Sequence, residues 1–405
     1  MQIRPILAAL RRHRLATLLI AMEVALACAV LCNACFLVVQ RWKLIQINSG
    51  VDESALAVLT VNGFDPNQAA DLNARMLTGL RSIPGMQSVT VINQVPFGPQ
   101  AGAAGVSHDP DNFKNTIGVV DFVLGGPGTY QALGLKLVEG RLPQADDYRP
   151  ATNFAPPDGQ VLVSRALADH AWPGESPLGK DFWCDKLHFR VIGVVDHLAR
   201  AHPHDWGTQA TEWTVFTPTL PGGSLAGTYL LRADPHDLPR VLHNARDAVA
   251  KIAPDVVLDQ ENSQTVSDLR TTYFESDRIM INLLLGVIVT LLGVTALGIV
   301  GLASFWVQQR RRQIGIRRAI GATRGDILRY FQTENFLIVS GGIVLGMALA
   351  FGLNLLLMQH YELPRLPVYY LPIGALVLWG LGQLAVLGPA LRAAAVPPVV
   401  ATRSV

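Results

Sequence analysis

Four long apolar runs constrain the fold more than any other feature of this sequence. They cover residues 15–39, 279–307, 333–358 and 368–391. Each run is long enough to cross a hydrocarbon core of about 30 Å as a helix, which takes about 20 residues. The first run is too long for the apolar part of a signal peptide, and no small-residue cleavage site follows it. The sequence therefore predicts a multi-pass α-helical membrane protein with four transmembrane helices.

The distribution of charge predicts how these helices are oriented. The arginines gather in residues 1–14, 308–332 and 392–405, whereas residues 40–278 carry 19 Lys or Arg against 27 Asp or Glu. Short basic segments stay in the cytoplasm, while long domains are translocated largely regardless of charge. We expect both termini and the 308–332 segment to be cytoplasmic, with residues 40–278 and the short 359–367 loop outside. The formal net charge of +2 gives no reason to expect a nucleic-acid partner.

Residues 40–278 form one long external segment with the pattern of a mixed α/β domain. Residues 56–93 and 228–260 each have the pattern of a strand, a helix and a strand, with Pro or Gly at the breaks. We expect two split βαβ halves in one sheet, with a Gly- and Pro-rich, β-rich subdomain inserted at about 98–226. Residues 264–278 suit a helix that continues into the second span as a rigid stalk.

Two motifs in this domain mimic binding sites. GESPLGKD, residues 174–181, has the glycine and lysine spacing of a P-loop, but Asp181 stands where a Ser or Thr must bind Mg²⁺. His197, His202, His204 and Asp205 lie in an Ala- and Pro-rich loop without a fixed ligand geometry. We expect no metal site, no cofactor and no catalytic site in this chain.

Glycines inside the second and third runs favour close helix packing. They are Gly298, Gly301, Gly342 and Gly346, and the last two form a G-x-x-x-G pair. Small residues at helical spacing let helices approach closely in lipid, within one chain or between two. Ionisable residues are nearly absent from the runs, with Glu23 as the main exception. The spans therefore suit a mechanical role better than ion conduction.

Between the second and third runs lies an arginine-rich segment, residues 308–332, with seven arginines. Its pattern predicts that the second helix continues to about Ile320, stops at Gly321, and is followed by a capping box at Thr323 and Asp326. The apolar residues of this helix fall on the side away from its arginines: Ile316, Ala319 and Ile320. Taken alone, the segment is either a topology signal or a stiff docking surface for a partner.

Several motifs resemble one protein family. Residues 310–327 have the form R-x-x-x-I-G-I-R-R-A-I-G-A-T-x-x-D-I, and an apolar run follows. This motif resembles the signature of the FtsX-like permease superfamily of ABC transporters. Residues 130–141, 161–180 and 189–196 resemble the periplasmic core domain of MacB-type permeases, and residues 389–401 resemble the C-terminal motif of that family. Gln313 departs from the family pattern, which has an acidic residue there.

The resemblance implies a set of partners and a location. It implies a bacterial inner-membrane permease that works as a homodimer or heterodimer, embedded in lipid. It further implies that an ABC ATPase docks on the arginine-rich segment. The chain contains no Walker motif, so we expect this ATPase to be a separate polypeptide. A periplasmic adaptor and an outer-membrane channel are compatible with it. The docking positions that the motif implies are Arg310, Gln313, Ile314, Gly315, Ile316, Arg317, Arg318, Ala319, Gly321, Ala322, Thr323, Asp326 and Ile327.

Three functions share this architecture. The first, which we expect, is a MacB-like efflux or secretion permease that transmits ATP-driven motion to a periplasmic domain. The second is a lipoprotein-release permease, which extraction of lipoproteins from vesicles would reveal. The third is an FtsX-like regulator of a cell-wall hydrolase, which recovery of a hydrolase by residues 41–278 would reveal. An enzyme in its own right would show activity in the isolated external domain.

Overall fold

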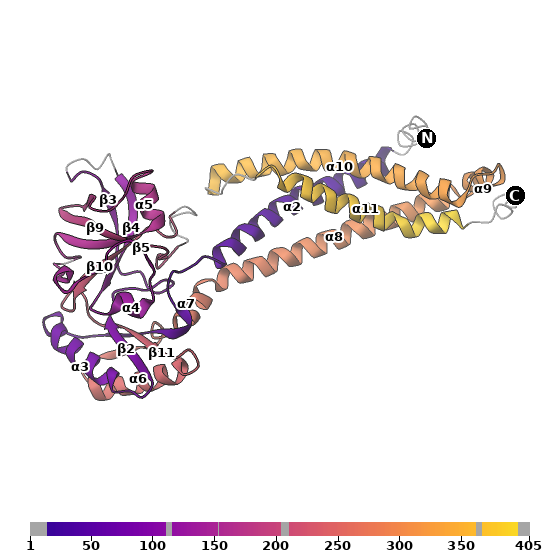
Figure 1. The fold of residues 1–405 in the computed structure, drawn as a ribbon. Coiled ribbons are helices and arrows are strands. Elements are labelled where there is room, and N and C mark those ends of the chain that lie inside the picture. Colours follow the sequence, from indigo (N-terminus) through magenta and orange to yellow (C-terminus); the bar gives the residue numbers. More distant parts are fainter. Residues whose placement is uncertain (1–13, 111–115, 153, 204–209, 362–366, 396–405) are drawn as a thin grey trace. The chain divides into compact units, whose positions relative to one another are not determined.

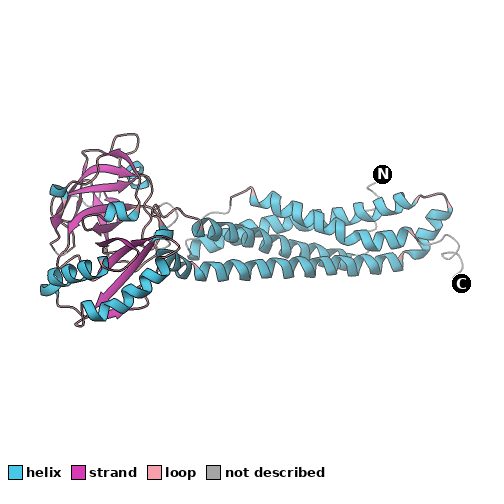
Figure 2. Cartoon of the chain, turned by 60° about the horizontal axis from the view of Figure 1, so that its bottom comes forward, coloured by secondary structure: helices cyan, strands magenta, loops and turns pink. Residues whose placement is uncertain are grey.

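A computed structural model of the chain divides it into two compact units. One unit joins residues 1–43 to residues 277–405, and the other is residues 44–276. All strands of the described residues lie in the second unit, as Figure 2 shows. The structure describes residues 14–110, 116–152, 154–203, 210–361 and 367–395.

Long helices build the first unit and run side by side in Figure 1. Four of them are long and apolar enough to cross a membrane, so the predicted fold class is confirmed here. They are α2 (Arg14–Ile45), α8 (Glu275–Gln309), α10 (Arg324–Tyr361) and α11 (Tyr370–Ala394).

Helix α2 lies at the centre of this bundle. Of its most apolar stretch, 56% is buried, against 11% for α8. The buried side chains of α8 nevertheless form one stripe at helical spacing, which includes Ile281, Ile288, Thr295 and Ile299. The opposite side of α8 is left to lipid or to a partner.

The connection into α8 differs from the prediction. In place of one continuous helix over 264–278, a short helix α7 (Val266–Tyr273) ends at Phe274 before α8 begins. Thr265 caps α7 by accepting a hydrogen bond from a backbone amide. Phe274 has non-helical backbone angles (φ −93°, ψ 10°), and its buried ring packs 5.5 Å from that of Phe97. Burial of this ring interrupts the helix.

A four-stranded sheet in the second unit contains the two predicted split βαβ halves. Its order is β12-β1-β11-β2, and each neighbouring pair is antiparallel. β1 and β2 are thus parallel with β11 between them, and β11 and β12 are parallel with β1 between them. The elements are β1 (Leu56–Asn62), α3 (Ala69–Arg81), β2 (Met86–Val91), β11 (Thr228–Ala233), α6 (Leu238–Ile252) and β12 (Val257–Asp259).

Helices α3 and α6 form because their apolar residues recur at helical spacing and can be buried. In α3 the buried apolar positions are Ala69, Leu72, Met76 and Leu80. In α6 they are Leu238, Val241, Leu242, Ala245 and Val249. Apart from Ala69, these side chains share one hydrophobic core with Leu59 and Leu231 of the sheet.

Between β2 and β11 the chain forms a closed barrel. Six strands pair in the ring β4-β3-β8-β9-β7-β10, and β10 closes it by pairing with β4 in parallel. The barrel strands are β3 (Ala103–Ser107), β4 (Thr116–Gly125), β7 (Gly159–Ser164), β8 (Asp181–Cys184), β9 (Leu187–Val195) and β10 (Thr214–Leu220). Around them lie α4 (Thr129–Leu133), β5 (Leu137–Gly140), β6 (Arg149–Pro150), α5 (Arg165–Ala171) and the 3-10 turn η4 (Ala145–Asp147). Two further 3-10 turns, η1 (Glu53–Ala55) and η2 (Pro66–Gln68), precede β1 and α3.

A buried ion pair ties a loop to this barrel. Asp121 of β4 and Arg200 are both fully buried, with 2.9 Å between a carboxylate oxygen and the guanidinium. The same carboxylate accepts a hydrogen bond from the backbone amide of Ala201 at 3.0 Å. Such additional bonds are needed before a buried pair can offset the cost of desolvating its charges.

The two motifs that mimic binding sites take ordinary structural positions. Asp181 accepts hydrogen bonds from Arg190 at the barrel surface. The His197 ring nitrogen lies 2.9 Å from the Glu212 carboxylate, and the His202 ring packs near Tyr273. His204 and Asp205 lie outside the described residues. Among the residues that are described, no three His, Cys, Asp or Glu side chains form a group that could hold a metal.

Candidate functional site

The arginine-rich segment contains a separate short helix. Helix α9 (Arg311–Ala319) lies between α8 and α10 at one end of the bundle, and Arg310 forms the break before it (φ −99°, ψ 8°). The prediction that α8 continues to about Ile320 is therefore wrong. The break at Arg310 coincides with the binding of its side chain to α10.

Arg310 belongs to a buried ion pair. Its Nη1 lies 2.9 Å from both carboxylate oxygens of Glu334 and 3.5 Å from the Tyr330 hydroxyl. The guanidinium carbon also lies 5.9 Å from the ring of Trp306. The two paired side chains are only 11% and 2% exposed. Arg310 therefore fixes α8 to α10.

Sequence reasoning missed Glu334, which lies at the start of the third apolar run. A signal for it was present, because a carboxylate beside an apolar span needs a cation partner. Its partner Arg310 comes from the segment before the run, so the pairing required knowledge of how α8 and α10 pack.

A small apolar cluster holds α9 against the bundle. Ile314 is 4% exposed and packs with the first turns of α10 and the last turns of α11. Gly315 beside it is also buried. Other buried members of the cluster are Ile327, Phe331, Ala390, Ala393 and Ala394. Helix α9 is thereby fixed to two membrane helices at once.

Arg317 and Arg318 have different environments. Arg318 donates a hydrogen bond of 3.1 Å from Nη1 to the carbonyl of Ala394, the last residue of α11. A cation at a helix C-terminus satisfies a free carbonyl and interacts favourably with the helix dipole. Arg317 is exposed, and its guanidinium carbon lies 4.8 Å from the centre of the Tyr330 ring. Arg318 is structural, whereas Arg317 remains accessible.

Gly321 ends α9 in a Schellman motif. Its φ is +108°, its amide donates to the Arg318 carbonyl at 3.2 Å, and the Ala322 amide donates to the Arg317 carbonyl at 3.0 Å. These two bonds define the motif, which favours glycine because its positive φ strains any other residue. The turn has the form that the sequence predicts.

The predicted capping box begins α10. The backbone amide of Asp326 donates to Thr323 Oγ1 at 3.2 Å, and the Asp326 carboxylate accepts from the Thr323 amide at 3.0 Å. The two side chains thus satisfy one another's backbone amides. A short, defined turn joins α9 to α10.

Replacing Gly321 with alanine will destabilise this turn by about 1–2 kcal/mol, because alanine resists a left-handed backbone. No atom of the described residues lies within 4 Å of the added methyl group, so the cost is backbone strain. Hydrogen exchange of the α9 amides will become roughly tenfold faster. Gly325→Ala is the control, because its methyl would meet only Thr323 Oγ1 at 3.7 Å. Equal exchange in both variants would contradict the role of Gly321.

One face of α9 is left exposed. Gln313, Ile316, Arg317 and Ile320 are all exposed and have the spacing i, i+3, i+4, i+7, which places them on one side of a helix. We call these four residues the outer face. Ile316 is 44% and Ile320 82% exposed. Arg317 therefore adjoins the two isoleucines, whereas the sequence prediction placed it opposite them. Ala319 is exposed as well.

The four predicted helix-packing glycines also differ in their surroundings. A Cβ at Gly342 or Gly346 would lie within 3 Å of atoms of α2, and one at Gly298 would lie 2.5 Å from the Glu23 carboxylate. At Gly301 no atom of the described chain lies within 4 Å of that position. Gly342 and Gly346 are thus used inside one chain and are not available for a contact between chains.

A family model and curated relatives match this chain. Residues 285–398 match the model of the FtsX-like permease C-terminal domain. The macrolide export ATP-binding/permease protein MacB of Aggregatibacter actinomycetemcomitans is 24% identical over 323 residues, covering 76% of this chain and 46% of that protein. The uncharacterized ABC transporter permease YknZ of Bacillus subtilis is 22% identical over 348 residues, covering 84% of this chain and 81% of that protein. The chain thus spans less than half the length of that MacB.

Solved structures of the globular regions of these relatives also match. The periplasmic region of MacB from Actinobacillus actinomycetemcomitans covers 56% of this chain and 97% of its own chain, with 18% identity and a TM-score of 0.36. The extracellular domain of YknZ covers 48% of this chain and 93% of its own, with 14% identity and a TM-score of 0.32. From the family match and the permease relatives, residues 285–398 are an FtsX-like permease domain, and the chain is homologous to ABC transporter permeases of the MacB and YknZ type.

Proposed function

We propose that this permease transmits ATP-driven motion from an ABC ATPase docked on α9 to the 44–276 domain across the membrane. The movement of that domain would drive efflux or secretion of a substrate. The MacB relatives are named for the export of macrolides. The permease family implies an ATPase partner, and these 405 residues contain no Walker motif. We propose a separate chain for this ATPase.

The outer face of α9 is the observation that carries this proposal. It exposes two isoleucines and one arginine on a helix that Ile314 and Arg318 fix to the bundle. Three contacts provide that attachment: the Arg310–Glu334 ion pair, the Ile314 cluster and the Arg318–Ala394 hydrogen bond. A force applied to the outer face would therefore move α8, α10 and α11 together.

The orientation of the chain follows from the same proposal. The arginine-rich segment and both termini would lie in the cytoplasm of a bacterial cell, where short basic segments are retained. The 44–276 domain would lie on the other side of the inner membrane. Two permease chains, identical or paralogous, would form the transporter and would contact one another through surfaces other than Gly342 and Gly346.

Replacing Ile316 and Ile320 together with serine will weaken ATPase binding by at least about tenfold. Burying one such side chain at an interface contributes about 1.5–3 kcal/mol, and both are exposed here, so the permease itself will fold normally. The measurements are co-purification with the ABC ATPase, for which one encoded beside this gene is the candidate, and its stimulation in nanodiscs.

A matched control replaces two exposed valines of the globular domain, Val138 and Val257, with serine. This variant loses a similar amount of exposed apolar surface but will bind and stimulate the ATPase normally. Full binding and stimulation by the Ile316/Ile320 variant would show that the ATPase docks elsewhere.

A further inference from the structure

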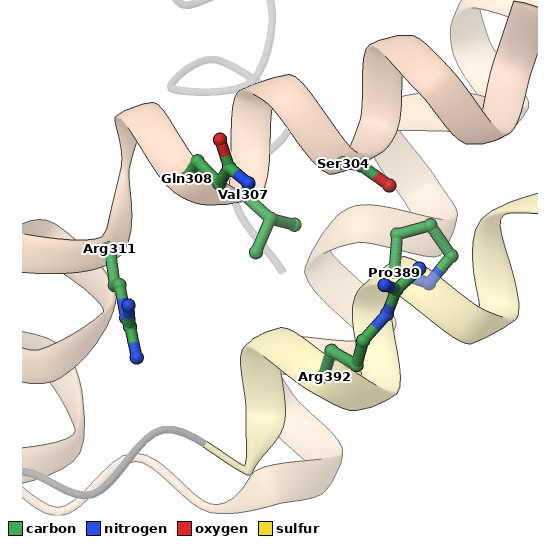
Figure 3. A pocket seen from close by; sticks show the side chains of 6 residues that line it. All are labelled: Ser304, Val307, Gln308, Arg311, Pro389 and Arg392. Carbon is green, nitrogen blue, oxygen red and sulfur yellow. The ribbon is translucent and has the colours of Figure 1, made fainter.

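A basic pocket lies between α8 and α11, near the start of α9. Its volume is about 230 Å³, and Figure 3 shows side chains of α8 and α11 facing each other across it. This is smaller than the roughly 300–1,000 Å³ of pockets for drug-sized ligands, so it suits a compact polar group. The lining residues are Ser304, Val307, Gln308, Arg311, Pro389 and Arg392.

The polar lining of this pocket favours an anion. Arg311 and Arg392 contribute two guanidinium groups, and Ser304 and Gln308 add a hydroxyl and an amide that can donate. Among the described residues, no acidic side chain lines it, and no carboxylate lies within ion-pair distance of either arginine. Arg310, one residue away, is by contrast bound to Glu334. Two unpaired guanidinium groups facing one pocket have the chemistry that binds phosphate.

The apolar surroundings of the pocket favour a phosphate group that is attached to a hydrocarbon chain. Val307 of α8 and Pro389 of α11 form apolar walls between the polar groups. Leu297 lies seven residues before Ser304, two turns away on the same side of α8, and is 73% exposed. A ligand with a phosphate in the pocket and a hydrocarbon chain along α8 would satisfy both surfaces.

We propose that this pocket binds the phosphate of an anionic phospholipid. Basic pockets between membrane helices near their ends bind lipid headgroups in this way. In the orientation of the proposed function, the lipid belongs to the cytoplasmic leaflet. The headgroup would connect Arg311, the first residue of α9, with Arg392 of α11. Lipid composition would thereby influence how firmly the ATPase-docking helix is held.

Native mass spectrometry of the full chain tests this proposal. Protein from nanodiscs of phosphatidylcholine with a minor fraction of phosphatidylglycerol will retain phosphatidylglycerol preferentially. The variant with Arg311→Gln and Arg392→Gln will lose this retention by about tenfold or more, because both charge-assisted contacts are removed. The control with Arg312→Gln and Arg324→Gln loses the same charge from exposed arginines that do not line the pocket, and it will behave like the wild type.

Three outcomes would overturn the proposal. Equal retention in both variants would show that the pocket does not bind the lipid. Displacement of phosphatidylglycerol by inorganic phosphate alone would identify a site for a soluble anion. Loss of ATPase binding by the pocket variant in nanodiscs of pure phosphatidylcholine would assign the pocket to the ATPase. Because retention is measured without the ATPase, failure of the docking proposal would leave the lipid result unaffected.

Discussion

Glu334→Gln will lower the free energy of unfolding of the helix bundle by about 3–5 kcal/mol. The substitution keeps the size of the side chain but removes the negative charge from beside Arg310. Arg310 is only 11% exposed, so its charge would remain buried without a carboxylate. Breaking one member of a buried pair is costly for this reason, even when the intact pair contributes little net stability.

Chemical denaturation in detergent micelles measures this loss, and two further variants separate its causes. Glu275→Gln makes the same chemical change at an exposed position at the start of α8 and will change stability by less than about 0.5 kcal/mol. Replacing Arg310 with Met and Glu334 with Leu together removes both charges and will cost less than Glu334→Gln alone. A double variant less stable than the single one would show that the attraction between the charges, rather than an uncompensated charge, dominates.

The local features of the arginine-rich segment could be predicted from its sequence. Gly321 as a stop signal and the Thr323–Asp326 capping box depend on residues a few positions apart. The split βαβ halves were predictable for a similar reason, since each follows from alternating strand and helix patterns bounded by Pro and Gly. Local patterns determine where such elements begin and end.

The roles of individual arginines could not be predicted, because they depend on contacts between distant parts of the chain. Arg310 binds Glu334 on the next helix, and Arg318 binds Ala394, 76 residues later. The family motif implies that Arg310, Arg317 and Arg318 all belong to one docking surface. The structure leaves Arg317 accessible and uses the other two to hold α9 in place.

The breaks in two helices and the closure of the barrel could not be predicted either, because they also depend on contacts between distant parts of the chain. The breaks at Phe274 and Arg310 follow from burial of an aromatic ring and of a charged group, which a local helical pattern does not show. The barrel closes when β10 pairs with β4, so that Thr214 lies opposite Asp121. Strand pairing over such a separation leaves no periodic signal in the sequence.

A second large effect is expected at the contact between α2 and α10. A Cβ at Gly346 would lie 2.5 Å from Cβ of Cys28 and 2.6 Å from the carbonyl oxygen of Ala25. A Cβ at Gly342 would lie 2.7 Å from the carbonyl oxygen of Ala21. These neighbours are backbone atoms or a Cβ attached to the backbone, so they cannot move aside unless the two helices separate. Further along the same contact, Asn33 donates a hydrogen bond of 3.2 Å to the Ala350 carbonyl.

Gly342→Ala and Gly346→Ala will therefore each destabilise the bundle by about 1–3 kcal/mol through overpacking, and the double variant by more. Gly341→Ala and Gly352→Ala are the matched controls, because no atom of the described chain lies within 4 Å of either added methyl group. In these two, the helix propensity of alanine will leave stability unchanged or raise it by up to about 1 kcal/mol. Denaturation of all variants in the same detergent measures the difference. If all four substitutions were equally tolerated, α2 and α10 could not be in the close contact that makes α2 the centre of the bundle.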